Sequence, residues 1–469
     1  MKRVAVLFVG ALTALLLLLA QVGNRGPWWA LVIPPALAQT PQATEPRSAQ
    51  ELALAFDSIT QRVTQLRGLP LLHEVPRVVL TPEQYRQRLL DELNDPDTRQ
   101  EIESSRRLMV ALGLLSPDVD LYQLEVEFRT GVVLGQYDPD TKELYVITGH
   151  DPLAPMERVT FAHEMTHALQ DQHYDIRTLM PKHSDNSDRD LAVSALLEGD
   201  ALIMEEIFQR QAMTRAEREE KQRQERSLSS GLNLDQLPLV VVEETYFPYV
   251  AGPRFIVNVV GQDAIREALD TGNGYGARMD PLFRNPPRSS AQILHPEKYL
   301  QGVEPIPVRF PDLAAALGEG WQQLRKDVLG EIDHRILIQQ YSNRETGERA
   351  AQGWAGDAFA LLSNGPDVAV VVRSHWDTPA DASKWLAAYT QLMRARYGTR
   401  LEVVDQREDR VAWRTPDGAQ VLRLTGTITD LAIAPSLPQA VALEQALSGA
   451  PRGAVRVPWA DLARLLGAR

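Results

Sequence analysis

The spacing of hydrophobic residues changes along the chain and predicts helices first and strands later. Residues 51–115 have a helical pattern, and residues 81–84 are a typical helix start, with Thr81 as N-cap and Pro82 in the first turn. Between residues 121 and 150 the spacing becomes two, which is the period of a strand. The apolar residues that alternate there with charged ones are Leu124, Val126 and Phe128.

A strand hairpin and two long helices are expected next. Residues 132–137 and 143–147 have strand patterns and flank the turn sequence Asp138-Pro139-Asp140. Helices are predicted over residues 156–172 and 190–213. The run that follows, residues 215–226, mixes both charges, which is typical of a solvated helix face, and we assign it no function.

The remainder of the chain has a different pattern. After a loop at 227–235, residues 281–296 are rich in proline and should be irregular, and the pattern resets near residue 350. A small α+β unit without an obvious catalytic cluster is expected from there on. Its predicted strands are 368–373, 401–404, 411–414 and 421–424, with a helix opening at 378–381 and a hairpin turn at 415–418.

The N-terminus has the features of an export signal. Lys2 and Arg3 precede an apolar run over residues 4–20, and Ala36-Leu37-Ala38 suits a signal peptidase. The alternative is a retained membrane anchor, since that run is just long enough to span a bilayer. With 469 residues the chain is too long for one compact core. We therefore expect an α+β protein with a signal peptide (1–38), a flexible leader (39–50), a first domain with a helical N-terminal part (51–350) and a small second domain (351–469).

Charge and cysteine content exclude several classes of function. The net charge of −13 disfavours nucleic acid as a partner, because an acidic chain repels phosphate backbones. There is no cysteine, so disulfides, cysteine-ligated zinc and a cysteine nucleophile are all excluded. Any metal must therefore be bound by histidine and carboxylate.

The segment around residue 163 carries the motif HExxH. His163 and His167 are four residues apart, so on a helix they lie on one face with Cβ atoms about 5–6 Å apart, close enough to share one zinc ion. Glu164 lies to one side, where it can take a proton from water. The apolar stripe of this helix lies well around from the two histidines, so we expect them to face a cleft. That stripe is Val159, Ala162, Met165 and Leu169.

Two residues compete to be the third protein ligand. His173 stands ten residues after His163, the spacing of the longer HExxHxxGxxH motif, but Gln170 occupies the position where that motif needs glycine for a sharp turn. Glu198 lies on a mostly apolar face of the second long helix, where an ionised carboxylate needs a partner such as a metal, and we favour it. Glu205 and Glu206, further along that helix, should face solvent.

HExxH followed by a glutamate on a second helix resembles the gluzincins, the thermolysin-like zinc metallopeptidases. The resemblance covers residues 163–171 and 198–201. It implies a zincin-like fold in which His163, His167 and Glu198 bind Zn²⁺ and Glu164 is the base. It also implies that the strand at residues 143–147 is an edge strand that pairs with extended substrate.

The resemblance offers candidates for supporting roles. A tyrosine or histidine stabilises the oxyanion in gluzincins, and Tyr249, in a Tyr-x-x-Gly segment, and His295 are both candidates. Asp171 resembles the acidic residue that follows the motif, and it and Asp200 are candidate partners of the ligands. The sequence thus predicts an exported zinc metallopeptidase acting on peptide or protein substrates, which meets a membrane only if its N-terminal segment is retained. The alternative is a non-enzymatic exported surface or scaffold protein on a zincin-like fold.

Overall fold

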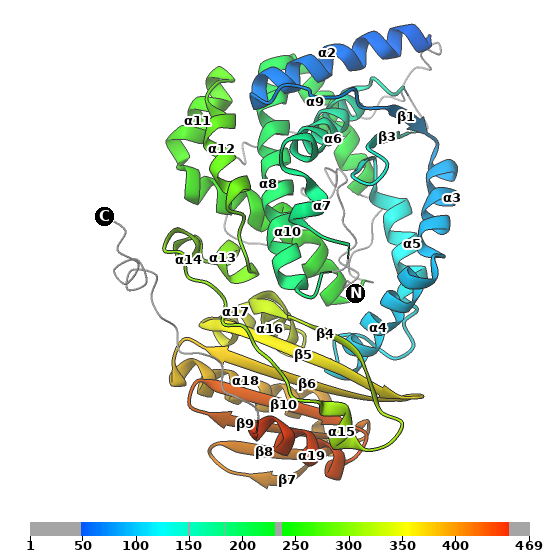
Figure 1. Ribbon diagram of the computed structural model, residues 1–469. Coiled ribbons are helices and arrows are strands. Elements are labelled where there is room, and N and C mark those ends of the chain that lie inside the picture. Colours follow the sequence, from blue (N-terminus) through cyan, green and yellow to red (C-terminus); the bar gives the residue numbers. More distant parts are fainter. Residues whose placement is uncertain (1–47, 149–150, 183, 230–236, 450–469) are drawn as a thin grey trace.

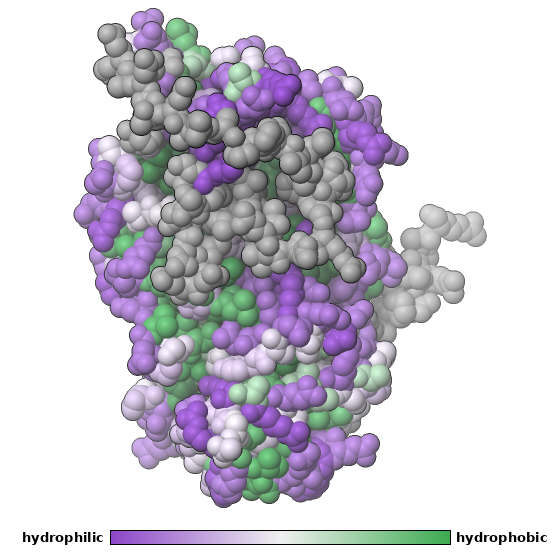
Figure 2. Space-filling view, turned by 180° about the vertical axis from the view of Figure 1, so that it is seen from behind, coloured by the Kyte–Doolittle hydropathy of each residue, from purple (hydrophilic) through white to green (hydrophobic). Residues whose placement is uncertain are grey.

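A computed structural model describes residues 48–148, 151–182, 184–229 and 237–449. The predicted signal peptide and residues 39–47 of the predicted leader lie outside these ranges. The described part has a mixed α+β fold in which a mainly helical half stands on a large sheet (Figure 1). No helix in the described ranges is long and apolar enough to cross a membrane. Seen from behind, the described surface is mostly hydrophilic, with smaller hydrophobic patches (Figure 2).

The helical half contains long helices around a small sheet. Its first elements are α2 (Ala49–Arg67), β1 (Arg77–Leu80), α3 (Pro82–Leu93), α4 (Pro96–Leu112), α5 (Leu121–Val132), β2 (Gly135–Asp138) and β3 (Glu143–Ile147). They are followed by α6 (Pro155–Tyr174), α7 (Ile176–Leu179), α8 (Ser187–Ala212), α9 (Arg215–Ser229), α10 (Leu239–Val260), α11 (Gln262–Thr271), α12 (Tyr275–Arg284), α13 (Ser290–Leu294) and α14 (Pro296–Leu300). The predicted helix start at Thr81 is confirmed, with a complete capping box.

Several stretches of this half differ from the sequence prediction. The strand β1 lies within residues 51–115, where we predicted helix. Residues 121–132 form the helix α5, where we predicted a strand. Its buried face includes Glu125 and Arg129, and these two charged residues hide the helical period of the apolar positions. Residues 281–296 are also more regular than predicted, because α12 continues to Arg284 and α13 and α14 follow.

The three-stranded sheet has the order β1-β3-β2. The predicted hairpin is confirmed, since β2 and β3 pair antiparallel, whereas β1 pairs parallel with β3. β3 is therefore the central strand, and our prediction that it is an edge open to substrate was wrong. Both β2 and β3 lie against α6.

The other half contains a seven-stranded antiparallel sheet in the order β4-β5-β6-β10-β9-β8-β7. One face shares the core of the helical half through α16 and α18, and the other packs on α15 and α19. The sheet includes β4, which precedes the boundary that we placed at residue 351; the strands and the hairpin turn predicted beyond it are confirmed. The elements are α15 (Leu313–Leu317), β4 (Gln322–Asp327), α16 (Gly330–Gln339), α17 (Arg344–Ala351), β5 (Trp354–Asn364), β6 (Asp367–Trp376), α18 (Pro379–Tyr397), η2 (Gly398–Arg400), β7 (Glu402–Gln406), β8 (Arg410–Thr415), β9 (Gly418–Thr425), β10 (Ile428–Ala434) and α19 (Leu437–Ser448).

A buried polar network fastens the sheet to α8. The backbone N–H of Ser187, in the first turn of α8, donates to Asp327 of β4 at 2.7 Å. Arg325 bonds the same carboxylate at 2.6 Å and also reaches Ser105 of α4 at 2.9 Å. The large sheet thus fixes one end of the helix that carries Glu198.

The helices α8 and α10 cross at two glycines. A Cβ added to Gly252 would lie 2.0 Å from the carbonyl oxygen of Ala195 and 3.2 Å from Cα of Gly199, so the two backbones touch there. This contact explains why α10 needs glycine at the last position of its Tyr-x-x-Gly segment. It also fixes α10 beside the turn of α8 that contains Glu198.

We expect Gly252→Ala to lower the free energy of unfolding by about 1–3 kcal/mol, because the added methyl group must push the two helices apart. Gly449→Ala is the control, since the nearest atom to its added Cβ is 3.8 Å away. Denaturant unfolding measures both variants. Equal stability of the two would contradict the close crossing of α8 and α10.

Candidate metal centre

The HExxH motif lies in the middle of α6, which is buried on all sides from Val159 to Asp171. β2 and β3, α2, α8 and α9 all pack against it. The side chains of His163 and His167 are fully buried. Within the described ranges neither side chain has exposed surface, and the cleft that we expected beside the pair stays a prediction.

Three side chains bring their ligand atoms together at one point. Nε2 of His163 lies 3.1 Å from Nε2 of His167, and the two nitrogens are 3.2 and 3.5 Å from Oε2 of Glu198. A tetrahedral ion with bonds of about 2.0–2.1 Å separates its ligand atoms by about 3.3–3.4 Å, so this triangle has the size that zinc requires. In the described ranges, one ligand atom from each of these three residues lies within 4.8 Å of the other two, which is close enough to hold one metal ion.

The second carboxylate oxygen of Glu198 is also consistent with a bound cation. Its Oε1 is buried and has no hydrogen-bond partner within the described residues. A buried carboxylate oxygen without a partner is costly, and a divalent ion between Glu198 and the two imidazoles would supply the missing interaction. Two neutral imidazoles and one carboxylate are a ligand set typical of catalytic zinc.

His173 is not part of this group. It lies at the C-terminal end of α6, and its Nε2 bonds the carbonyl oxygen of Pro70 at 2.7 Å. The helix continues through Gln170, where the longer motif would turn, so His173 stays on the far side of the helix end. The choice of Glu198 over His173 agrees with the geometry.

Glu164 is held in place by the edge strand β2. Its Oε2 accepts a hydrogen bond of 2.7 Å from the backbone N–H of Tyr137. Gly135 permits this close approach, because a Cβ there would lie 2.4 Å from Thr160 and 3.1 Å from Cγ of Glu164. The strand thus fixes the carboxylate of the residue that follows His163 in the chain.

A second carboxylate, that of Glu205, lies near the Nδ1 atom of His163. Its Nδ1 lies 3.4 Å from Oε2 of Glu205, which in turn bonds Nζ of Lys221 on α9 at 3.0 Å. Our prediction that Glu205 faces solvent was wrong, since this residue is only 4% exposed. Such outer partners orient imidazole ligands and increase their basicity.

His167 has a longer chain of partners. Its Nδ1 lies 2.8 Å from Oε1 of Gln170, whose Nε2 donates to Asp200 at 2.8 Å. Nε of Arg67, in the last turn of α2, bonds the same oxygen of Asp200 at 3.1 Å. Asp200 therefore acts on His167 through Gln170, a residue that we had regarded only as a departure from another motif.

Asp171 was predicted to be a candidate partner of the ligands, and its hydrogen bonds lead elsewhere. Its carboxylate accepts hydrogen bonds from the hydroxyl of Tyr137 at 2.7 Å, from Nζ of Lys142 at 2.6 Å and from the backbone N–H of Ile176 at 3.1 Å. These partners tie the end of α6 to the β2–β3 hairpin. Neither His163 nor His167 is among them.

The two candidate oxyanion residues lie in different surroundings. Tyr249 is buried on α10, one turn before Gly252, which touches Gly199 next to Glu198. His295 lies between α13 and α14, and its Nε2 bonds Glu331 of α16 at 2.7 Å. His295 thus bonds a helix of the large sheet's half, whereas Tyr249 lies on the helix that crosses α8 beside Glu198.

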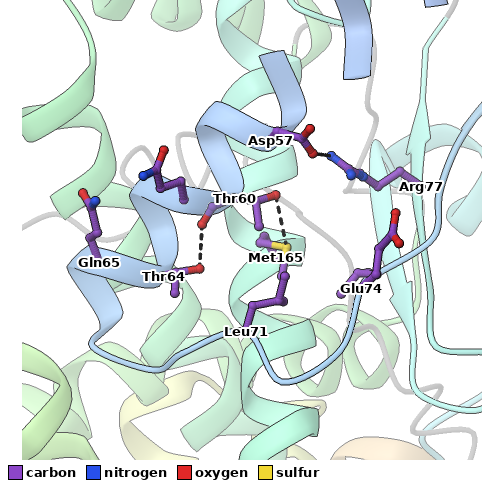
Figure 3. Close-up of a pocket in the computed structure, with 10 residues that line it drawn as sticks. Asp57, Thr60, Thr64, Gln65, Leu71, Glu74, Arg77 and Met165 are labelled. Atoms are coloured by element: carbon purple, nitrogen blue, oxygen red, sulfur yellow. Dashed lines mark hydrogen bonds and ion pairs between the residues drawn. The ribbon is translucent and has the colours of Figure 1, made fainter. Parts of the chain in front are cut away.

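A cavity of about 430 Å³ lies on another side of α6 (Figure 3). Met165 of α6 lines it together with Thr60 and Thr64 of α2 and Leu71 of the following loop, and Thr60 bonds the sulfur of Met165 at 3.7 Å. The three ligands and Glu164 do not line this cavity. It therefore belongs to the packing between α2 and α6 and not to the candidate metal centre.

One protein family matches a part of the chain outside this centre. Residues 319–444 match the model described as "Domain of unknown function (DUF8575)". The match covers the seven-stranded sheet and α16 to α18, and it contains none of the ligands, Glu164 or their partners. No curated protein and no solved structure matches the chain.

We expect purified protein to hold about one zinc ion per chain, bound by three protein ligands. Elemental analysis should show that His163→Ala, His167→Ala and Glu198→Ala each remove the zinc. His173→Ala is the control and should keep it, because the imidazole of His173 bonds the carbonyl of Pro70. Loss of zinc in the His173 variant and its retention in the Glu198 variant would reverse the ligand assignment.

Zinc binding should also depend on pH. Burial alone lowers the pKa of His163, but hydrogen bonds with Glu198 and Glu205 and the charge of Glu164 outweigh it and raise the pKa to about 10. In the zinc-free protein, the stabilisation from this raised pKa is complete below the unfolded value of about 6.5 and is lost as the pH rises through 10. Between these values zinc must displace the proton.

The apparent affinity for zinc should therefore rise with pH from 7 to 9, by up to about tenfold per unit. Competition with a chelator whose own pH dependence is known measures this slope, and thermal melting of the zinc-free protein should show falling stability over the same range. An affinity that does not change with pH would mean that His163 holds no proton for zinc to displace.

Proposed function

We propose that this protein is an exported zinc-dependent metallopeptidase that resembles the gluzincins. The observation that carries the proposal is the triangle of ligand atoms from His163, His167 and Glu198, with Glu164 next to it on the same helix. A site that only bound metal would have no need for Glu164 in this position. The N-terminal sequence, which lies outside the described residues, is the basis for export.

Zinc, when bound, would act as a Lewis acid that polarises the peptide carbonyl and makes water a better nucleophile. The chain supplies the proton transfer. The carboxylate of Glu164 accepts a proton from the attacking water and returns it to the nitrogen of the departing amine. The hydrogen bond from the Tyr137 N–H fixes that carboxylate, so no reorganisation is required during the reaction.

Tyr249 is our candidate for the group that donates a hydrogen bond to the oxyanion. The contact between Gly252 and Gly199 holds its helix against the turn that bears Glu198. His295 is the weaker candidate, because Glu331 already occupies its Nε2 at 2.7 Å and raises its pKa by hydrogen bonding. A neutral phenol can donate to developing negative charge and needs no change of protonation state.

One observation favours a second reading, a purely structural zinc site in an exported surface or scaffold protein. The two histidines and Glu198 are buried, and structural zinc sites are typically closed to solvent. In that case Glu164 would contribute to packing through Tyr137 and would take no part in chemistry. The two readings differ in the effect that replacing Glu164 should have on peptide hydrolysis.

Glu164→Gln should keep zinc and lower peptide hydrolysis by about a hundred- to ten-thousand-fold, because the amide has nearly the same shape but cannot accept the proton from water. The assay is cleavage of an unfolded protein, with zinc content measured on the same samples. Glu206→Gln is the matched control, since Glu206 is half-buried and pairs with Arg210 one turn along the surface of α8. Full activity in the Glu164 variant would show that Glu164 is not the base and would contradict the proposed mechanism, whereas no hydrolysis by a wild-type protein that holds zinc would favour the structural reading.

A further inference from the structure

The helix α9 docks without burying an apolar side chain in its described part. Its sequence is dominated by charged residues, and its two buried side chains are Lys221 and Glu225, which are 6% and 4% exposed. Charged residues are rarely buried to this extent unless they have a specific partner. The sequence of α9 suggests a solvated helix face, so these two residues need a separate explanation.

Lys221 is the centre of a buried ion-pair group. Its Nζ lies 3.0 Å from Oε1 of Glu205 on α8 and 2.8 Å from Oε1 of Glu225 on its own helix. The other oxygen of Glu205 faces Nδ1 of His163 at 3.4 Å. One ammonium group thus holds two buried carboxylates, and one of these carboxylates faces a metal ligand.

The remaining contacts of α9 fasten it to the same two helices. Glu217 pairs with Arg158 of α6, and Arg218 donates to backbone oxygens at the end of α8. These contacts are partly exposed, so solvent and salt weaken them. The buried contact of Lys221 with Glu205 is therefore the specific link between α9 and the candidate metal centre.

We propose that Lys221 is a positioning residue for the metal centre, which holds Glu205 against His163 and so gives α9 control over how tightly the site binds its metal. The inference rests on the zinc site of the proposed function but not on peptide hydrolysis. Without Lys221, the buried carboxylate of Glu205 would lose the ammonium group that lies 3.0 Å from it, which is strongly unfavourable. Glu205 would then leave Nδ1 of His163 or draw in water.

The first test is the zinc dissociation constant, measured by competition with a chelator. Lys221→Met keeps the length of the side chain and removes its charge, and it should weaken zinc binding by about 10–100-fold, as loss of an outer partner of a metal ligand usually does. Lys221→Arg should recover most of the affinity. Arg223→Met is the control on the same helix, because Arg223 is exposed and pairs only with Glu220, and it should leave the affinity unchanged.

The decisive test is a double-mutant cycle with Glu205→Gln. If Lys221 acts through Glu205, Lys221→Met should have little further effect on zinc affinity when Glu205 is already glutamine. An undiminished effect in that background, or no effect of Lys221→Met on its own, overturns the proposal. Should the methionine variant not fold, Lys221→Gln, which keeps a polar group in the buried position, replaces it in the same cycle.

The outcomes also separate this proposal from the proposed function. A wild-type protein that binds no zinc contradicts both. A wild-type protein that binds zinc but cleaves no peptide contradicts only the peptidase, and the cycle still decides the role of Lys221. Melting of the zinc-free variants provides the remaining control, since a merely structural role would lower their stability without coupling Lys221 to Glu205 in zinc affinity.

Discussion

The burial of Glu198 opposite two imidazoles is the constraint on which the rest of this structure depends. A carboxylate that is removed from water, with one oxygen that has no partner among the described residues, is stabilised by a cation, and the nitrogens of His163 and His167 lie where they can share one. The crossing at Gly199 and Gly252 holds this turn of α8 in place. The bond between Ser187 and Asp327 fixes its first turn to the large sheet.

Around this centre, buried carboxylates are paired with buried cationic side chains on the neighbouring helices. Each imidazole of the candidate centre connects through its contacts to a carboxylate and then to a buried cationic side chain on an outer helix. His163 leads through Glu205 to Lys221, and His167 leads through Gln170 and Asp200 to Arg67. Burial alone lowers the pKa of Arg67 and Lys221, but their carboxylate partners raise it, so both stay charged. The outer helices α2 and α9 therefore contribute to the electrostatics of the site as well as to packing.

The sequence predicted what depends on local patterns and missed what depends on buried charge. HExxH and the apolar neighbours of Glu198 pointed to the three side chains that the structure brings together, and turn residues identified both hairpins. The period of α5 was misread because Glu125 and Arg129 interrupt its buried face, and Glu205 and Lys221 were placed in solvent for the same reason. A charged residue carries no sign of its burial until its partner is known, and the partner of Glu205 lies on another helix. Gln170 could have been identified, since a polar residue three positions after His167 on a buried helix can reach its Nδ1.

We propose that the chain binds zinc at this site and uses it to hydrolyse peptide bonds. The most direct measurement is the cleavage of an unfolded protein by the purified chain before and after treatment with a chelator, with the fragments identified by mass spectrometry. We expect cleavage to stop when zinc is removed and to return when about one equivalent is added back. Cleavage that persists in the zinc-free protein, or its absence in a protein shown to contain zinc, would contradict this proposal.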